Sequence, residues 1–271
     1  MRLRTPFRSS RPRLKTPSDT MSLRDHLQEL RVRIVRAVLA VALGFTAIIV
    51  FYKSVLDFLS KPLYRLCKDG VVSPGGAGTC AELISLGPID AFGARVSISV
   101  YGGLIIALPV VMWQLWRFIA PALHHNEKKY AVGFVLSSVG LFLLGSVIAY
   151  FTLEPALKFL IDFGQAQPTY QISKYISFVG LMAAAFGIGF QFPVLLVFLQ
   201  LVNAVNHRQL IKWWRYALVS IVVLAAAITP SGDPVSLVAL AVPMIFLYVV
   251  SVIIGGFISR RRAKKASAPS A

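Results

Sequence analysis

The stretch that decides the fold is Val235-Ser-Leu-Val-Ala-Leu-Ala-Val-Pro-Met-Ile-Phe-Leu-Tyr-Val-Val-Ser-Val-Ile-Ile-Gly-Gly-Phe-Ile258, followed directly by Ser259-Arg-Arg-Arg-Ala-Lys-Lys265. The first part has no charged residue, and apolar stretches of this kind are typical of transmembrane helices. The second part is a cluster of bases, which membrane proteins keep on the cytoplasmic side. The stretch therefore predicts a membrane span that ends in the cytoplasm.

Five more apolar segments precede this one. The six segments cover residues 33–52, 96–117, 130–152, 175–202, 213–228 and 235–258. Six crossings put both chain ends and two loops on one face of the membrane and three loops on the other. Of the 28 Lys and Arg, 21 fall on the first face, whereas the second face carries seven bases and seven acids. This asymmetry marks the first face as cytoplasmic. We expect an all-α, polytopic membrane protein with six transmembrane helices and both termini in the cytoplasm.

The mean hydropathy of +0.71 excludes an ordinary soluble domain. We expect one membrane domain over residues 21–258, between a basic, disordered cytoplasmic tail at 1–20 and a basic cytoplasmic tail at 259–271. The first tail lacks the apolar core of a signal peptide, and Met21 is an alternative start of the chain. Because the bases are spread over positions that flank spans, membrane lipid rather than nucleic acid is the expected partner.

Two amphipathic segments accompany the spans. Residues 22–33 form an entry helix to the first span, with apolar positions at helical spacing. Residues 55–66, interrupted by Pro62, form a second stripe, which we expect to lie along the outer interface in the first exterior loop. Four tryptophans at span ends suggest an aromatic belt at the cytoplasmic interface: Trp113, Trp116, Trp213 and Trp214.

The fifth span, residues 213–228, is short, at about 24 Å as a helix. The turn Thr229-Pro-Ser-Gly-Asp-Pro234 joins it tightly to the sixth. We expect spans five and six both to be too short for an unperturbed bilayer, so that the membrane thins beside them or the pair tilts toward one side.

Catalytic and cofactor motifs are missing from the sequence. All four histidines, including the adjacent His124 and His125, lie at predicted cytoplasmic helix ends, and the spans contain almost no ionisable groups. We therefore expect no enzyme, no metal site and no cofactor; a metal held by the histidine pair is the weaker alternative to an interfacial role. A secondary transporter would need midplane charges and internal repeats, and an intramembrane enzyme would need paired catalytic groups at depth.

The two cysteines, Cys67 and Cys80, both fall in the first exterior loop. The space outside a bacterial inner membrane can be oxidising, so a disulfide that closes the Gly-rich tip at 73–79 is one interpretation. Two incidental thiols are the other.

Carboxylates are scarce on the basic face, which makes Glu29 and Glu127 informative. Each could form a local salt bridge, Glu29 with Arg33 and Glu127 with the lysines that follow it. Each could instead accept a guanidinium from outside the chain, because a carboxylate offers two oxygens to the planar fork of arginine. The residues alone leave these alternatives open.

Within the spans, the notable polar residue is Gln191, in Phe186-Gly-Ile-Gly-Phe-Gln-Phe-Pro193. Pro193 removes a helical hydrogen bond, so a bend is expected here. An amide at this depth needs a partner. The partner is either another span of this chain or a polar group at a functional concave face.

Together these stretches resemble the TatC family, the core receptor of the twin-arginine protein translocase. The resemblance extends from Met21 to about Gly256 and rests on four motifs in order: Ser22-Leu-Arg-Asp-His-Leu-Gln-Glu-Leu-Arg-Val-Arg33, Trp116-Arg-Phe-Ile-Ala-Pro-Ala-Leu123 with Glu127-Lys-Lys129, Phe190-Gln-Phe-Pro193, and Ile228-Thr-Pro-Ser-Gly-Asp-Pro234. The cysteine-bearing insertion and the long basic tails depart from the family pattern.

The resemblance implies a protein that binds twin-arginine signal peptides of folded cargo, assembles with TatA-type and TatB-type single-span subunits and with other copies of itself, and depends on the proton-motive force. The expected location is the bacterial inner membrane. The implied signal-peptide residues are Glu29, Glu127, His26, Arg31, Phe118 and Pro121. Gln191, with Phe190 and Pro193, is the expected partner-helix contact, and Asp233 matches an aspartate of the last exterior turn. The family commonly has Glu where Gln191 stands, and a neutral amide at this position keeps hydrogen bonding but cannot titrate.

Overall fold

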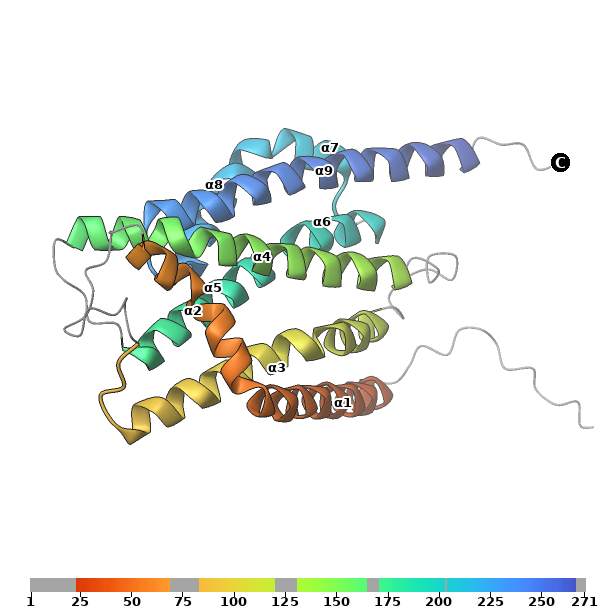
Figure 1. Cartoon of the computed structure of the whole chain (residues 1–271). Coiled ribbons are helices and arrows are strands. Elements are labelled where there is room, and N and C mark those ends of the chain that lie inside the picture. Colours follow the sequence, from red (N-terminus) through yellow and green to blue (C-terminus); the bar gives the residue numbers. More distant parts are fainter. Residues whose placement is uncertain (1–22, 69–82, 120–130, 165–170, 203, 267–271) are drawn as a thin grey trace, which may run out of the picture.

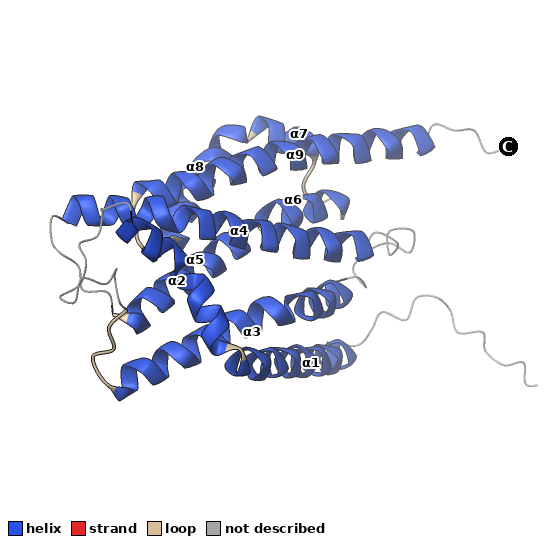
Figure 2. Cartoon of the chain, in the orientation of Figure 1, coloured by secondary structure: helices blue, strands red, loops and turns tan. Residues whose placement is uncertain are grey.

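The computed structural model describes residues 23–68, 83–119, 131–164, 171–202 and 204–266. These residues are helical apart from short connections and one isolated bridge between Ile84 and Gln171 (Figures 1 and 2). The helices are α1 (Leu23–Val50), α2 (Tyr52–Lys68), α3 (Pro88–Ile119), α4 (Ala131–Gly164), α5 (Ile172–Gly189), α6 (Phe192–Leu201), α7 (His207–Lys212), α8 (Trp214–Ile228) and α9 (Pro234–Ala266).

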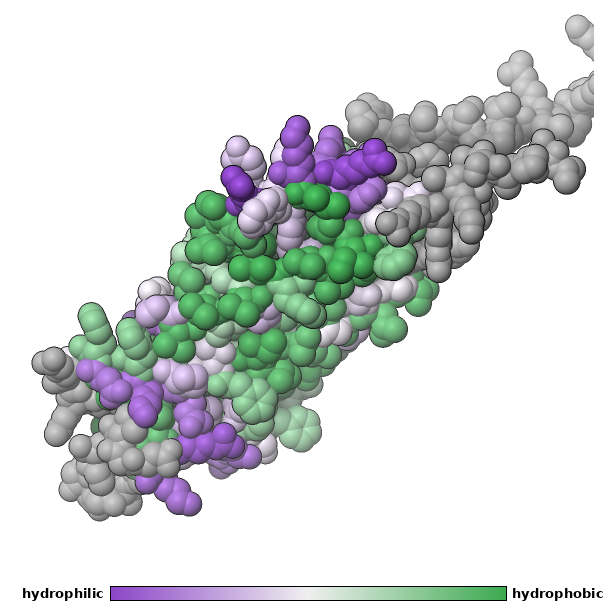
Figure 3. Space-filling model, turned by 90° about the horizontal axis from the view of Figure 1, so that it is seen from above, coloured by the Kyte–Doolittle hydropathy of each residue, from purple (hydrophilic) through white to green (hydrophobic). Residues whose placement is uncertain are grey.

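The long helices run roughly side by side, and the start of α1 and the ends of α3, α6 and α9 lie at the same end of the molecule (Figure 1). In the described part, five helical stretches are long and apolar enough to cross a membrane, and α8 is a shorter apolar helix of 15 residues. Figure 3 shows a hydrophobic belt between two hydrophilic ends. The all-helical, multi-span architecture predicted from the sequence is therefore confirmed, whereas the count of six crossings and the side of each end stay predictions.

Several helices extend beyond their predicted apolar segments. The entry helix and first span are one continuous helix, α1; α3 begins already at Pro88; and α4 continues to Gly164. Hydropathy marks only the part of a helix that lies in hydrocarbon, whereas backbone hydrogen bonding continues into the interface.

The sixth span is not short, which corrects the expectation for spans five and six. The apolar part of α9, Pro234–Ser259, has 26 residues, so it measures about 39 Å as a helix. Only α8, at 15 residues or about 22 Å, is shorter than the bilayer core. The prediction therefore holds for the length of α8 but not for that of α9, although a tight turn joins the two helices.

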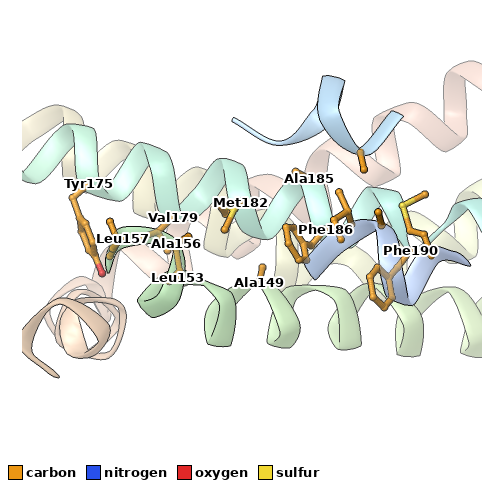
Figure 4. Close-up of a cluster of buried hydrophobic side chains, with 14 of the residues drawn as sticks. Ala149, Leu153, Ala156, Leu157, Tyr175, Val179, Met182, Ala185, Phe186 and Phe190 are labelled. Atoms are coloured by element: carbon orange, nitrogen blue, oxygen red, sulfur yellow. The ribbon is translucent and has the colours of Figure 1, made fainter. Parts of the chain in front are cut away.

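The predicted bend in the fourth span is present. The helix breaks between α5 and α6, at Phe190 and Gln191, because Pro193 supplies no N–H at the start of α6. The buried side chains of α5 face those of α4 along this region, as Figure 4 shows for Phe186 against Ala149 and for Val179 against Leu153. This buried interface between α4 and α5 forms the centre of the molecule.

Helix α2 packs across the second half of α4 and the start of α5, and one tyrosine from each of these helices donates a hydrogen bond to its backbone. Pro62 has no N–H to donate to the carbonyl of Phe58, four residues earlier, and the Tyr150 hydroxyl of α4 donates to that carbonyl at 3.2 Å. The Tyr175 hydroxyl of α5 donates to the neighbouring Leu59 carbonyl at 2.7 Å. The proline that interrupts the amphipathic stripe thus leaves a backbone acceptor through which α2 is held.

Helices α1 and α3 approach each other closely at a pair of glycines. A Cβ built on Gly44 would lie 2.5 Å from the Gly103 carbonyl oxygen, and one on Gly103 would lie 2.5 Å from the Phe45 nitrogen. Only glycine at both positions permits this spacing. The contact sets the distance between the two helices whose other ends carry the candidate site.

The geometry of the turn between α8 and α9 accounts for the residues found in it. Gly232 adopts φ +61°, a left-handed conformation that favours glycine. Asp233 is buried and caps α9: its Oδ1 accepts the N–H of Ser236 at 2.7 Å, and its Oδ2 accepts the Ser231 hydroxyl. Such caps contribute about 1 kcal/mol, so Asp233 has a structural role in this turn.

Candidate functional site

The candidate site lies where α1 begins and α3 ends. Glu29 and Arg33, one turn apart on α1, form an ion pair. A cavity of about 350 Å³ adjoins this pair. Its lining residues come from both helices and are Gln28, Glu29, Val32, Arg33, Arg36 and Arg117. The site is therefore a recess between two helix ends with one carboxylate among three guanidinium groups.

The two oxygens of Glu29 differ in their surroundings. Oε1 accepts from Arg33 Nη2, whereas Oε2 is buried and has no hydrogen-bond partner within the described ranges. The Nε of Arg33 is likewise buried and unpartnered there. A buried carboxylate oxygen without a donor is unfavourable by about 1–3 kcal/mol or more, so it provides a driving force for a donor to enter. The local salt bridge between Glu29 and Arg33 is present, as one of the two alternatives predicted, and it leaves one carboxylate oxygen for an outside group.

The structure describes only some of the remaining predicted site residues. Arg31 is exposed on α1, and Phe118 is half-buried at the end of α3. The side chain of His26 and the whole of Glu127 and Pro121 lie outside the described residues. Helices α3 and α4, which flank the segment with Glu127, end and begin at the end of the molecule that carries Glu29 (Figure 1). The roles of these residues stay predictions.

An aromatic cluster that sequence reasoning missed holds those flanking helices together. The ring of Trp116 stacks on Phe134 of α4 at 4.6 Å and meets Phe198 of α6 edge-on at 5.3 Å. Its Nε1 donates to Ser138 Oγ at 2.8 Å. Trp116 is 6% exposed, so its assignment to an interfacial belt was wrong; Trp113, Trp213 and Trp214 are exposed. An indole next to a span end signals either location, and only the facing helix distinguishes them.

Gln191 makes its observed hydrogen bond within the chain. Its Nε2 donates to the carbonyl oxygen of Ser138 in α4 at 2.9 Å, and the side chain is half-buried at the break between α5 and α6. Phe190 and Pro193 beside it are buried. The amide nitrogen of Gln191 therefore bonds another span of the same chain, which was one of the two alternatives predicted. A contact between Gln191 and a partner helix stays a proposal.

Cys67 is buried at the end of α2 and is disulfide-bonded. Cys80, the only other cysteine of the sequence, lies outside the described residues, so the pairing itself stays a prediction. In the described part of the chain there is no group of three His, Cys, Asp or Glu that could hold a metal ion.

The fold defines a polytopic, all-helical membrane protein with a polar recess at one end. A family model described as "Sec-independent protein translocase protein (TatC)" matches residues 25–243. The chain belongs to the TatC family and is therefore a protein translocase component, which confirms the family indicated by its motifs.

Relatives and solved structures agree. The chain is 37% identical to the TatC protein of Frankia casuarinae, over 93% of this chain and 71% of the relative. It is 35% identical to the TatC protein of Aquifex aeolicus, over 89% of this chain and 98% of the relative. A crystal structure titled "Twin Arginine Translocase Receptor- TatC" superposes with a TM-score of 0.69 at 35% identity and covers 86% of this chain and 99% of the other.

Proposed function

We propose that this protein is the receptor subunit of a twin-arginine translocase and that it binds the guanidinium groups of a signal peptide at Glu29 and Glu127. The observation that carries the proposal is the buried, unpartnered Oε2 of Glu29 beside a cavity between α1 and α3. A guanidinium donates through a planar fork and remains charged at any physiological pH. It matches a carboxylate oxygen that lacks a donor better than a lysine ammonium does.

The basic surroundings make this recess selective. Arg36 and Arg117 are exposed, so water screens their charges, whereas Arg33 is mostly buried with Glu29. A peptide cation gains from this surface only where it reaches the carboxylate. We propose that Glu127 belongs to the same site, as the family resemblance implies, and that it offers a second acceptor for the second arginine.

The test is a change from carboxylate to amide. Glu29→Gln keeps the shape of the side chain but removes its charge, and a hydrogen bond to a charged group contributes roughly 1.5–3 kcal/mol. The affinity for a twin-arginine signal peptide should fall about 10-fold to 100-fold. Fluorescence titration of the purified protein in detergent measures it, with Glu127→Gln tested in parallel.

Two controls accompany the titration. A twin-lysine version of the peptide should bind weakly to the wild type and lose little further affinity in either variant. Asp57→Asn, at an exposed position of α2, removes a carboxylate far from the recess and should leave both affinities unchanged. Equal binding of the twin-arginine peptide by the wild type and both glutamine variants would contradict the proposal.

The wider proposal concerns assembly and location. We place the protein in a bacterial inner membrane with six spans and both termini in the cytoplasm, where it associates with TatA-type and TatB-type helices and further copies of itself for export driven by the proton-motive force. The family supports such a complex. The break at Gln191 supports a contact there, because a half-buried amide with one hydrogen bond to Ser138 retains unused bonding capacity.

A further inference from the structure

A second polar recess lies where the apolar part of α9 ends. It has a volume of about 250 Å³ and lies between the end of α6, the start of α7 and α9. Its lining residues are Gln200, Val205, Asn206, His207, Gly255, Ile258 and Ser259. Ser259 is the last residue of the apolar stretch, and Arg260 follows it in the sequence. The recess is therefore at the depth of lipid headgroups, and it shares no lining residue with the recess at Glu29.

The amide of Gln200 is fixed in orientation. Its Nε2 donates to the carbonyl oxygens of Leu196 at 3.3 Å and Ser251 at 3.1 Å. Turning the amide over would set its oxygen against two other oxygens, so Oε1 must face the opposite way. There it lies against Gly255, where a Cβ would come within 1.5 Å of it. Gly255 provides the space for this oxygen.

Two acceptors in this recess lack donors. Gln200 is 6% exposed, and its Oε1 is buried with no hydrogen-bond partner among the described residues. The same holds for Nδ1 of His207, an acceptor in the tautomer that carries its proton on Nε2. Ser259 already uses its hydroxyl to donate to the Gly256 carbonyl at 3.0 Å. The recess thus offers acceptors and calls for a ligand with several N–H groups.

The charges around the recess restrict the class of ligand further. No carboxylate is among the described residues that line the recess, and Arg208 and Lys212 are exposed in the adjoining helix α7, so these residues offer a bare cation no counter-charge. A zwitterionic ligand carries its own counter-charge. We propose that this recess binds the headgroup of a phospholipid with a primary ammonium, such as phosphatidylethanolamine. The ammonium donates to Gln200 Oε1 and His207 Nδ1, and Arg208 binds the phosphate.

The test uses headgroups that differ only in the number of N–H donors. Phosphatidylethanolamine, its N-methyl and N,N-dimethyl forms and phosphatidylcholine carry three, two, one and no donors. Native mass spectrometry of the purified full chain with each lipid measures the bound fraction. We expect binding to fall stepwise along the series, by about 10-fold from the first lipid to the last. Equal binding of all four lipids by the wild type would overturn the proposal.

Variants localise the effect. Gly255→Ala displaces the Gln200 oxygen, and Gln200→Met removes it, so both should bind all four lipids at the phosphatidylcholine level. Gly256→Ala is the matched control, because its Cβ meets nothing closer than His207 at 3.9 Å; it should keep the preference. Arg208→Gln should weaken binding of every lipid by the same factor. A full preference retained in Gly255→Ala and Gln200→Met, both still melting cooperatively, would reject this site.

Binding of the twin-arginine peptide is followed in the same variants. It should be unchanged, because the two recesses share no lining residue. Unchanged peptide binding in Glu29→Gln would contradict the proposed function alone, whereas a headgroup preference that persists in Gly255→Ala and Gln200→Met would contradict the lipid site alone.

Discussion

At the scale of single residues, Arg33 determines how Glu29 can be used. It occupies one carboxylate oxygen and buries most of its own side chain in doing so. A peptide guanidinium that arrives at Glu29 therefore meets a competitor from the same helix. The pair resembles the complex that the receptor is proposed to form, with an internal arginine in place of a peptide arginine.

Arg33→Gln should strengthen binding of the twin-arginine peptide. The change frees Glu29 Oε1 and removes one like charge, and each effect favours the incoming cation; we expect a gain of about 3-fold to 10-fold. The same titration in detergent measures it. Arg36→Gln, which removes an exposed charge from the same recess, is the control and should gain less. A weaker affinity in Arg33→Gln than in Arg36→Gln would show that Arg33 assists binding instead.

Gln191 gives a second prediction at this scale. Gln191→Leu loses the bond to Ser138, worth on average about 0.6 kcal/mol between membrane helices, so fold and peptide binding should persist. Copurification of a TatA-type or TatB-type subunit and export should fall. Gln191→Glu should be tolerated, because a neutral carboxyl can still donate to the same carbonyl. Disulfide mapping from a cysteine at 191 that gives crosslinks only within the chain would reject the partner contact.

At the scale of elements, the hold on α2 can be measured. Tyr175→Phe removes the donor to the Leu59 carbonyl, in a side chain that is 5% exposed, and should reduce stability by about 1–2 kcal/mol. Tyr150→Phe removes the longer bond to the more exposed Phe58 carbonyl and should reduce it less. Thermal unfolding in detergent compares the two. A larger loss for Tyr150→Phe would mean that the bond to the Phe58 carbonyl, which Pro62 leaves without an N–H donor, contributes more than the buried bond to the Leu59 carbonyl.

Sequence reasoning succeeded where one segment determines its own structure. Pro193 breaks the helix before α6, and Gly232 with Asp233 forms the last turn, because backbone chemistry decides both locally. It failed where two distant segments meet. The burial of Trp116 depends on α4 and α6, and the recess at Gln200 exists only because Gly255 faces it from α9. Glu29 was identified from its rarity on a basic face, but its unpartnered oxygen required the packed side chains.

At the scale of the whole molecule, the basic residues predict the orientation. In a variant with both native cysteines replaced by serine, Ser73→Cys should react with a membrane-impermeant maleimide in intact cells. Ser9→Cys and Ser267→Cys should react only after the membrane is opened, because the Lys and Arg excess keeps both chain ends in the cytoplasm. Labelling of position 267 but not of position 9 in intact cells would contradict an even number of crossings, and labelling of both would contradict the cytoplasmic location of the ends.

The short α8 also has an electrical consequence. A membrane voltage falls across the low-dielectric layer that separates two aqueous phases, and a charge that crosses it gains about 2.3 kcal/mol per 100 mV whatever the thickness. Where the bilayer adapts to α8, that layer measures about 22 Å instead of about 30 Å. The field there is steeper by roughly a third. A charged group that moves a given distance beside α8 therefore takes more energy from the membrane voltage than one that moves equally far beside α1 or α4.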